Sequence, residues 1–452
     1  MSRRFVARAL VVIALSAIAT LSLSHSAVAQ AQAAAKPTAT ADTSTQVFDA
    51  GGVHVILRRN TANDVIAANL YLLGGVQQST AQNAGTEPFL LWVSERGTKH
   101  YTRDALTAKM AALGSAIVVE PRDDWTMFGF RGTRDTFDST WAILTDRLIN
   151  PTLAPADVEF IRAQVLSGVR QRNDSPDDLV QGLADSLLFT GQPYALSSTG
   201  DEKSLTTISA ADLQKYRATQ MVTSRMLLVV VGNIERARLE KLIVPTLGTL
   251  PRGAYKWTPP PDPIARPADV VFVQRPLPTN YLLGYYPGPR SMSPDYQALR
   301  IATSVLSGRL FTEIRVRRNL TYDVSAPFIE RAIASGGLYV TTVYPDSVLG
   351  IMRREIGRMQ NTLLDPENLN VIVQQFITEY YLNNETDAEQ ANQIARAEVY
   401  RGDYRLAGQF VDQLRAVTPE QIRDAARKYM RGTHFAFVGD SAKVSRALIT
   451  SF

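Results

Sequence analysis

The feature that most constrains the fold of this chain is an internal repeat. Four segments of the first half recur in the second half, in the same order and at an offset of about 210 residues. The pairs are 135–144 with 346–352, 150–155 with 361–366, 208–216 with 417–425, and the apolar runs 227–232 with 435–439. A chance likeness between helical patterns is the alternative, and the preserved order of four pairs argues against it. The sequence therefore predicts two copies of one domain.

Each half mixes strand-like and helix-like patterns. The apolar segments 65–73 and 125–131 are typical of strands, whereas 107–113 and 211–219 are typical of helices, with Ser209 as an N-cap. Strands interspersed with helices favour a sheet covered by helices. We expect an α/β (α+β) fold with two homologous domains, each a mixed β-sheet covered by helices.

A proline cluster marks the boundary between the two halves. The run Trp257-Thr-Pro-Pro-Pro-Asp-Pro cannot continue a helix or a central strand, because proline lacks the backbone N–H and has a fixed φ. We therefore expect an N-terminal domain over residues 47–249, an extended linker over 250–268 and a C-terminal domain over 269–452.

The N-terminus has the form of a secretory signal peptide. Three arginines, at positions 3, 4 and 8, precede an apolar run to about residue 23, and Ala27-Val-Ala29 is a small-x-small cleavage pattern. We expect residues 1–29 to be removed by cleavage near Ala29/Gln30 and 30–46, rich in Ala, Thr and Ser, to form a flexible leader. The prediction is a periplasmic protein; an uncleaved membrane anchor is the alternative.

Composition excludes several kinds of site. The chain has no cysteine, so it has neither a thiol nucleophile nor a cysteine-ligated metal. It has four histidines, His25, His54, His100 and His434, of which the first leaves with the signal peptide. Basic residues number 48 against 43 acidic ones, without a Lys/Arg cluster, so we expect no nucleic-acid partner. No apolar run in the body of the protein reaches the roughly 20 residues needed to span a bilayer, so we expect no stable membrane insertion.

The window from Gly85 to Thr98 carries a specific resemblance. It reads Gly-Thr-Glu-Pro-Phe-Leu-Leu-Trp-Val-Ser-Glu-Arg-Gly-Thr and resembles the zinc helix of the insulinase/pitrilysin-type metallopeptidases, whose form is roughly G-x-x-H-F-L-E-H-x-x-x-x-G-T. The frame residues Gly85, Phe89 and Gly97 fall in register. With the duplicated domain pattern, the resemblance extends over about residues 46–452 and implies the mitochondrial-processing-peptidase-like fold.

The zinc chemistry of that family is absent from the window. The H-x-x-E-H motif places two imidazoles on one helical face beside the glutamate that deprotonates the zinc-bound water. Here its places hold Pro88, Leu91 and Trp92, and the third ligand, about 75 residues downstream in the family, falls at Gly168. We expect a degenerate zinc site, apolar in character, with no metal and no catalytic residue of its own. The histidines of the mature chain are expected to be structural or surface residues.

A second family signal survives. The resemblance implies an Arg and a Tyr seven residues apart in the second domain, facing the zinc across a closed cavity, and Arg315 and Tyr322 have this spacing within Leu310–Val324. A guanidinium and a phenol aimed at the developing oxyanion stabilise the transition state electrostatically. From spacing alone, an arginine-bearing helix followed by an ordinary strand tyrosine remains the alternative.

Three functions remain open from the sequence. The first is the non-catalytic subunit of a periplasmic heterodimeric zinc metallopeptidase: a homologous zinc-bearing subunit would hydrolyse peptides, and this chain, inactive alone and without a cofactor, would supply Arg315 and Tyr322. The second is a catalytically inactive peptide-binding or assembly protein, as the related core subunits of a respiratory complex are. The third, a self-sufficient peptidase with displaced ligands, is disfavoured by the shortage of histidine and cysteine.

Overall fold

The computed structural model describes residues 44–452. The predicted signal peptide and residues 30–43 of the predicted leader lie outside the described residues. Strand β1 (Thr45–Ala50) begins within the last two residues assigned to the leader, because Thr45 and Gln46 pair with Arg58 and Leu57 of β2 (Val53–Arg59). Among residues 44–452, none of the helices combines the length and apolar character needed to cross a membrane.

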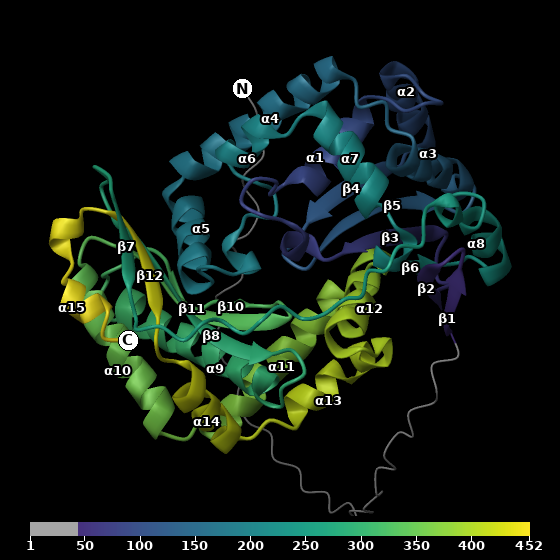
Figure 1. The fold of residues 1–452 in the computed structure, drawn as a ribbon. Coiled ribbons are helices and arrows are strands. Elements are labelled where there is room, and N and C mark those ends of the chain that lie inside the picture. The colour runs from purple at the N-terminus through teal and green to yellow at the C-terminus, as the bar shows by residue number, and fades with distance from the viewer. Residues whose placement is uncertain (1–43) are drawn as a thin grey trace, which may run out of the picture. The chain divides into compact units, whose positions relative to one another are not determined.

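The first half forms a six-stranded mixed sheet (Figure 1). Its order is β1-β2-β6-β3-β5-β4, in which β2 and β6 are parallel and the other neighbours are antiparallel. The remaining strands are β3 (Val65–Leu73), β4 (Ala116–Pro121), β5 (Trp125–Thr133) and β6 (Met226–Gly232).

The second half repeats this topology. Its sheet has the order β10-β11-β8-β12-β7, again with one parallel pair, β12 with β7, and antiparallel neighbours elsewhere. The strand that returns late in each half, β6 or β12, pairs in parallel with one neighbour and antiparallel with the other. The predicted fold class, two homologous domains related by duplication, is confirmed. The strands are β7 (Val270–Gln274), β8 (Asn280–Arg290), β9 (Val324–Ser325), β10 (Phe328–Ile329), β11 (Ile333–Thr342) and β12 (His434–Gly439).

Helices cover one face of each sheet with elements of its own half. In the first half these are α1 (Thr86–Val93), α2 (Arg103–Leu113), α3 (Phe137–Ile149), α4 (Pro155–Asp174), α6 (Glu202–Thr207), α7 (Ala210–Gln220) and α8 (Arg236–Ile243). In the second half they are α9 (Asp295–Leu310), α10 (Pro345–Asn361), α11 (Pro366–Asn383), α13 (Phe410–Arg415), α14 (Pro419–Tyr429) and α15 (Arg446–Ile449). Each set encloses one large apolar core.

Local sequence explains where corresponding helices begin. Ser209 caps α7 by accepting a hydrogen bond from the N–H of Asp212, and Thr418 caps α14 in the same way from Gln421. Both are capping boxes, in which the side chain at the third helical position bonds back to the N-cap N–H. The repeat therefore preserves a helix start with different residues.

The opposite face of each sheet is covered by one helix from the other half. Helix α12 (Asp387–Arg401) packs Ala391, Ile394 and Ala395 against the first sheet, and α5 (Pro176–Leu188) packs Val180, Ala184 and Leu188 against the second (Figure 1). Because both faces of each sheet are buried, β6 is apolar at every position from Met226 to Val231 instead of alternating. This exchange of α5 and α12 between the halves holds the two halves together through apolar contacts.

Residues 250–269 join the halves without forming a helix or strand. This segment begins after the short 3-10 turn Leu247–Thr249 and ends at β7, and it contains the whole proline cluster. Proline neither donates to a ladder nor fits a helix interior, which explains the lack of regular structure here; the linker bounds 250–268 remain a prediction.

Candidate functional site

Helix α1 carries the window that resembles a zinc helix, and its start is set by Gly85. This residue is the N-cap with φ 82°, in the left-handed region. A Cβ at this position would lie 2.7 Å from the backbone of Thr199 and Gly200, far inside van der Waals contact. The glycine of the frame therefore has a packing role that does not depend on metal chemistry.

The four positions that the resemblance predicts as a degenerate zinc site are divided between core and cavity. Pro88 lies in the first turn of α1 and is buried, and Leu91 is fully buried in the apolar core. Trp92 is half-buried and lines a cavity, together with Gly168 of α4. The structure thus brings Trp92 and Gly168 to one cavity, whereas Pro88 and Leu91 are buried and do not line it.

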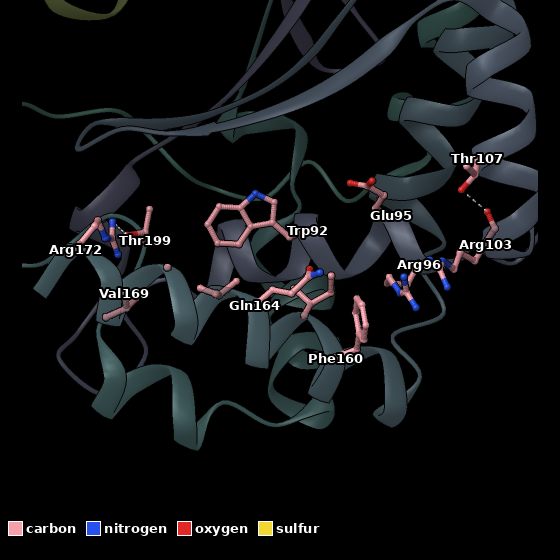
Figure 2. Close-up of a pocket in the computed structure, with 13 residues that line it drawn as sticks. Trp92, Glu95, Arg96, Arg103, Thr107, Phe160, Gln164, Val169, Arg172 and Thr199 are labelled. Carbon is pink, nitrogen blue, oxygen red and sulfur yellow. Dashed lines mark hydrogen bonds between the residues drawn. The ribbon is translucent and has the colours of Figure 1, made fainter. Parts of the chain in front are cut away.

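This cavity has a volume of about 630 Å³ and lies between α1, α2 and α4 (Figure 2). Its apolar lining comes from Trp92, Phe160, Ile161, Val165 and Val169. Its polar lining comes from Glu95, Arg96, Arg103, Thr107, Gln164, Arg172 and Thr199. Among the described residues, no group of three or more His, Asp or Glu side chains could hold a metal ion, here or elsewhere.

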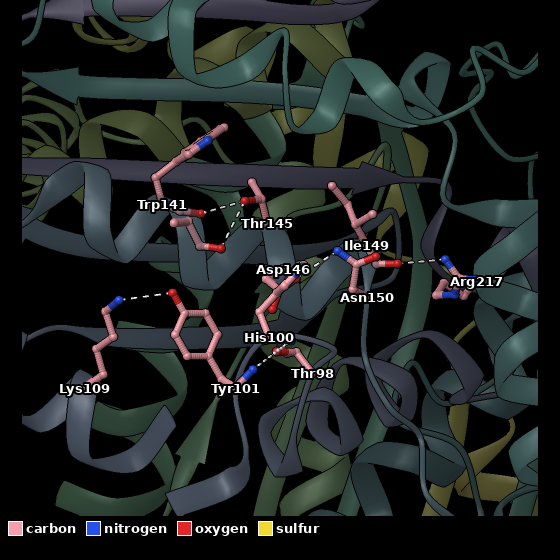
Figure 3. Close-up of polar contacts among 11 residues, drawn as sticks. Thr98, His100, Tyr101, Lys109, Trp141, Thr145, Asp146, Ile149, Asn150 and Arg217 are labelled. Carbon is pink, nitrogen blue, oxygen red and sulfur yellow. Dashed lines mark hydrogen bonds and ion pairs between the residues drawn. The ribbon is translucent and has the colours of Figure 1, made fainter. Parts of the chain in front are cut away.

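The three histidines of the described chain lie in other surroundings. His54 of β2 bonds to Glu398 of α12 at 3.1 Å, and this hydrogen bond raises the pKa of His54. His100 lies in a turn with its Nδ1 2.7 Å from Asp146 (Figure 3). His434 is buried at the start of β12, where burial lowers its pKa. None of these side chains lines the Trp92 cavity.

Arg315 and Tyr322 lie together although six residues separate them. Arg315 belongs to the π-helix Phe311–Val316, which continues directly from α9, and its guanidinium carbon is 4.8 Å from the centre of the Tyr322 ring. Between them the chain reverses at Asn319, whose φ of 51° is left-handed and whose N–H donates to the Arg315 carbonyl. Tyr322 lies outside any strand, two residues before β9, and 80% of its surface is exposed.

Of the three arginines in this segment, only Arg315 lacks an acidic partner among the described residues. Arg317 and Arg318 both pair with Glu313, at 2.5 and 2.6 Å. Arg315 forms no ion pair among the described residues and contacts the rings of Tyr322 and Phe311. The pair therefore presents a guanidinium and a phenolic hydroxyl outward, without an internal carboxylate to neutralise the charge. Neither residue lines the Trp92 cavity.

A buried polar network between the halves was not anticipated from the sequence. Asp124, 1% exposed, accepts hydrogen bonds from Tyr194 at 2.6 Å, from Tyr400 of α12 at 2.8 Å and from the N–H of Ala332. Burial raises the pKa of Asp124 to about 6, against the hydrogen bonds that lower it. Beside it, Arg331 pairs with carboxylates of the first half, Asp123 at 2.8 Å and Asp185 at 2.7 Å.

Comparison with known families identifies both halves. Residues 54–202 match the model for insulinase (peptidase family M16), and residues 207–376 match that for the peptidase M16 inactive domain. The mitochondrial-processing peptidase subunit beta of Blastocladiella emersonii is 24% identical over 408 residues, 86% of each chain.

Solved structures share the fold. The peptidase M16 inactive domain from Pseudomonas fluorescens superimposes with a TM-score of 0.79 at 20% identity, covering 88% of this chain and 98% of that one. The periplasmic protease PqqL from Escherichia coli gives 0.73 at 15% identity, covering 89% of this chain and 48% of that one. At these identities the likeness shows the two-domain fold.

Proposed function

Because this chain belongs to the insulinase-type (M16) peptidase family, we propose that it is the non-catalytic subunit of a periplasmic heterodimeric zinc metallopeptidase. The observation that carries the proposal is the contact of Arg315 with Tyr322 in a chain whose described residues, 44–452, include no group of side chains that could hold a metal ion. A homologous subunit would bind zinc, and this chain, inactive alone, would complete the site for peptide substrates.

The chemistry of the pair suits this role. Zinc held by the partner would polarise the scissile carbonyl and activate a water molecule. The Tyr322 hydroxyl and the Arg315 guanidinium would donate hydrogen bonds to the oxygen that becomes negative, or to the adjacent peptide backbone. The 80% exposure of Tyr322 supports action on a substrate outside this chain's own cavity.

The proposal assigns different duties to the two domains. Residues 47–249 would form the peptidase-like domain with the degenerate zinc site at Pro88, Leu91, Trp92 and Gly168. Residues 269–452 would form the domain that contributes Arg315 and Tyr322. Periplasmic location is supported by the signal-peptide pattern of residues 1–29 and by the similarity to a periplasmic protease.

The test is reconstitution. The mature chain is purified with the homologous zinc-bearing subunit from its native host, and hydrolysis of a fluorogenic peptide is measured with and without chelator. We expect activity only in the mixture, sensitivity to chelator, and a fall of about 10²-fold in kcat for Tyr322→Phe, as for loss of one oxyanion donor. Tyr344→Phe is the matched control, since Tyr344 is also exposed and lies outside the pair. Full activity of the partner alone would refute the proposal.

A second candidate is a peptide-binding or assembly protein without a catalytic role. The absence of a metal-binding group from the described residues is compatible with it. It predicts a stable complex with a peptide or a larger assembly, unaffected by Tyr322→Phe. Unchanged turnover of that variant in the reconstituted mixture would favour this second function.

A further inference from the structure

The Trp92 cavity has a counterpart at the equivalent place in the second half. A cavity of about 660 Å³ lies between α9, α10 and α11, and α9 and α11 line it as α1 and α4 line the first. Three lining residues of α4 correspond to three of α11 at one constant offset along the chain. They are Phe160, Ile161 and Gln164 in the first cavity and Val371, Ile372 and Gln375 in the second. The duplication therefore produced two related hollows, which can be compared directly.

The two cavities differ in charge. The first is lined by three arginines, Arg96, Arg103 and Arg172, against one glutamate, Glu95. The second is lined by two arginines and two glutamates, of which Arg358 and Glu355 pair at 3.1 Å. Of these two cavities, only the first therefore has a net positive lining, which favours an anionic ligand there.

Two of the three arginines have no carboxylate partner in the described part of the chain. Arg96 pairs with Asp157 at 3.0 Å, whereas Arg172 donates to the neutral hydroxyl of Thr199 at 2.7 Å. Arg103, at the first position of α2, forms no ion pair among residues 44–452. Figure 2 shows Arg103 and Arg172 on opposite sides of the Trp92 ring. A ligand that lies across the Trp92 ring would therefore have one arginine near each of its two ends.

The surface between these cations is apolar, with one amide group. Phe160 is 46% exposed, with the guanidinium carbon of Arg96 4.2 Å from its ring centre. Gln164 projects from α4 beside Trp92 (Figure 2) and offers both a donor and an acceptor, the two groups that a peptide backbone pairs with. At Gly168 a Cβ would meet no atom within 4 Å, so the absence of a side chain keeps the space open.

We propose that this cavity binds an acidic peptide segment, with an apolar side chain over Trp92 and Phe160 and a carboxylate near Arg103 or Arg172. The volume is within the range of small-ligand sites, roughly 300–1,000 Å³. The site uses neither zinc nor the Arg315–Tyr322 pair, and so goes beyond the proposed function. The degenerate zinc site, with Trp92 and Gly168 at two of its positions, would then serve as a peptide-binding site.

The test measures binding to the mature chain alone, so its result is independent of any peptidase activity. Isothermal titration calorimetry compares the peptide acetyl-Ala-Phe-Leu-Glu-Asp-Ala-amide with its neutral analogue, in which Gln and Asn replace the two acids. We expect the acidic peptide to bind at least about tenfold more tightly, with an affinity that falls as salt rises. Arg103→Gln with Arg172→Gln should remove this preference.

Gly168→Leu fills the cavity and should abolish binding. Its Cβ meets no neighbour, and leucine is a better helix former than glycine, so the fold should be retained. Gly308→Leu is the matched control, because Gly308 lines the second cavity and is equally free of neighbours, and it should leave binding unchanged. Equal binding of the two peptides, unchanged binding by Gly168→Leu, or displacement of the peptide by decanoate as a tighter ligand would overturn the proposal.

Discussion

The hydroxyl of Tyr400 in helix α12 donates a hydrogen bond to Asp124 of the first half, and the loss of this bond should lower the stability of the fold. Tyr400→Phe deletes the donor that lies 2.8 Å from the carboxylate of Asp124 and keeps the aromatic ring, whose centre is 5.2 Å from that of Trp125. The variant therefore tests one hydrogen bond between the halves with little change in packing.

The magnitude depends on the ionisation of Asp124, whose pKa burial raises to about 6. At pH 8 the acceptor is ionised, and a hydrogen bond to a charged group stabilises by about 1.5–3 kcal/mol. At pH 5 the carboxyl is mostly protonated, and the same bond contributes about 1 kcal/mol. We therefore expect Tyr400→Phe to lower the free energy of unfolding by about 2 kcal/mol at pH 8 but by only about 1 kcal/mol at pH 5.

The assay is urea denaturation at both pH values, followed by tryptophan fluorescence and far-UV circular dichroism, whose transitions must coincide for a two-state analysis. Tyr286→Phe is the control, because the Tyr286 hydroxyl is buried without a hydrogen-bond partner among the described residues. That variant should be neutral or slightly stabilising at both pH values. A cost for Tyr400→Phe that is equal at the two pH values, or as small as that of the control, would refute the reasoning.

Further predictions concern two buried charges. Because the folded pKa of Asp124, about 6, lies above its ordinary value of 3.8, its contribution to stability should fall by about 3 kcal/mol as pH rises from about 4 to 6; Asp124→Asn should remove this part of the pH dependence of the urea midpoint. Glu87→Ala leaves Arg225, 1% exposed and paired at 2.9 Å, without its carboxylate, and should cost about 3–5 kcal/mol in urea denaturation. Glu240→Ala, which breaks the exposed pair with Arg236, should cost under about 1 kcal/mol and would contradict this account if it cost as much as Glu87→Ala.

The duplicated fold was predictable because its signals are local. Capping residues such as Ser209 and Thr418 act within three residues of themselves, and the apolar strands ending at Gly232 and Gly439 are visible as short runs. The order of the strands and the exchange of α5 and α12 were not predictable. They depend on contacts between residues far apart in the chain, such as Val55 with Leu228 in the first sheet and His54 with Glu398 of α12, which no local pattern encodes.

The candidate site was predictable where a motif keeps a spacing. The frame around Gly85 located α1, and the interval from Arg315 to Tyr322 identified the pair that the structure stacks. The π-helix at Arg315 was not foreseen, because a helical periodicity does not distinguish a local π-turn from a regular helix. Arg103 and Arg172 were also missed, since each is an ordinary surface arginine until the fold brings both to one cavity.

The central claim is that zinc chemistry is absent from this chain and must come from a partner. Its most direct test is metal analysis of the isolated mature chain, purified without chelator and supplied with zinc, together with a peptide-hydrolysis assay. The account predicts less than about 0.1 zinc per chain after dialysis and no chelator-sensitive hydrolysis, because the positions that the family resemblance assigns to the zinc chemistry hold Pro88, Leu91, Trp92 and Gly168. One zinc per chain with chelator-sensitive hydrolysis by the isolated protein would contradict it.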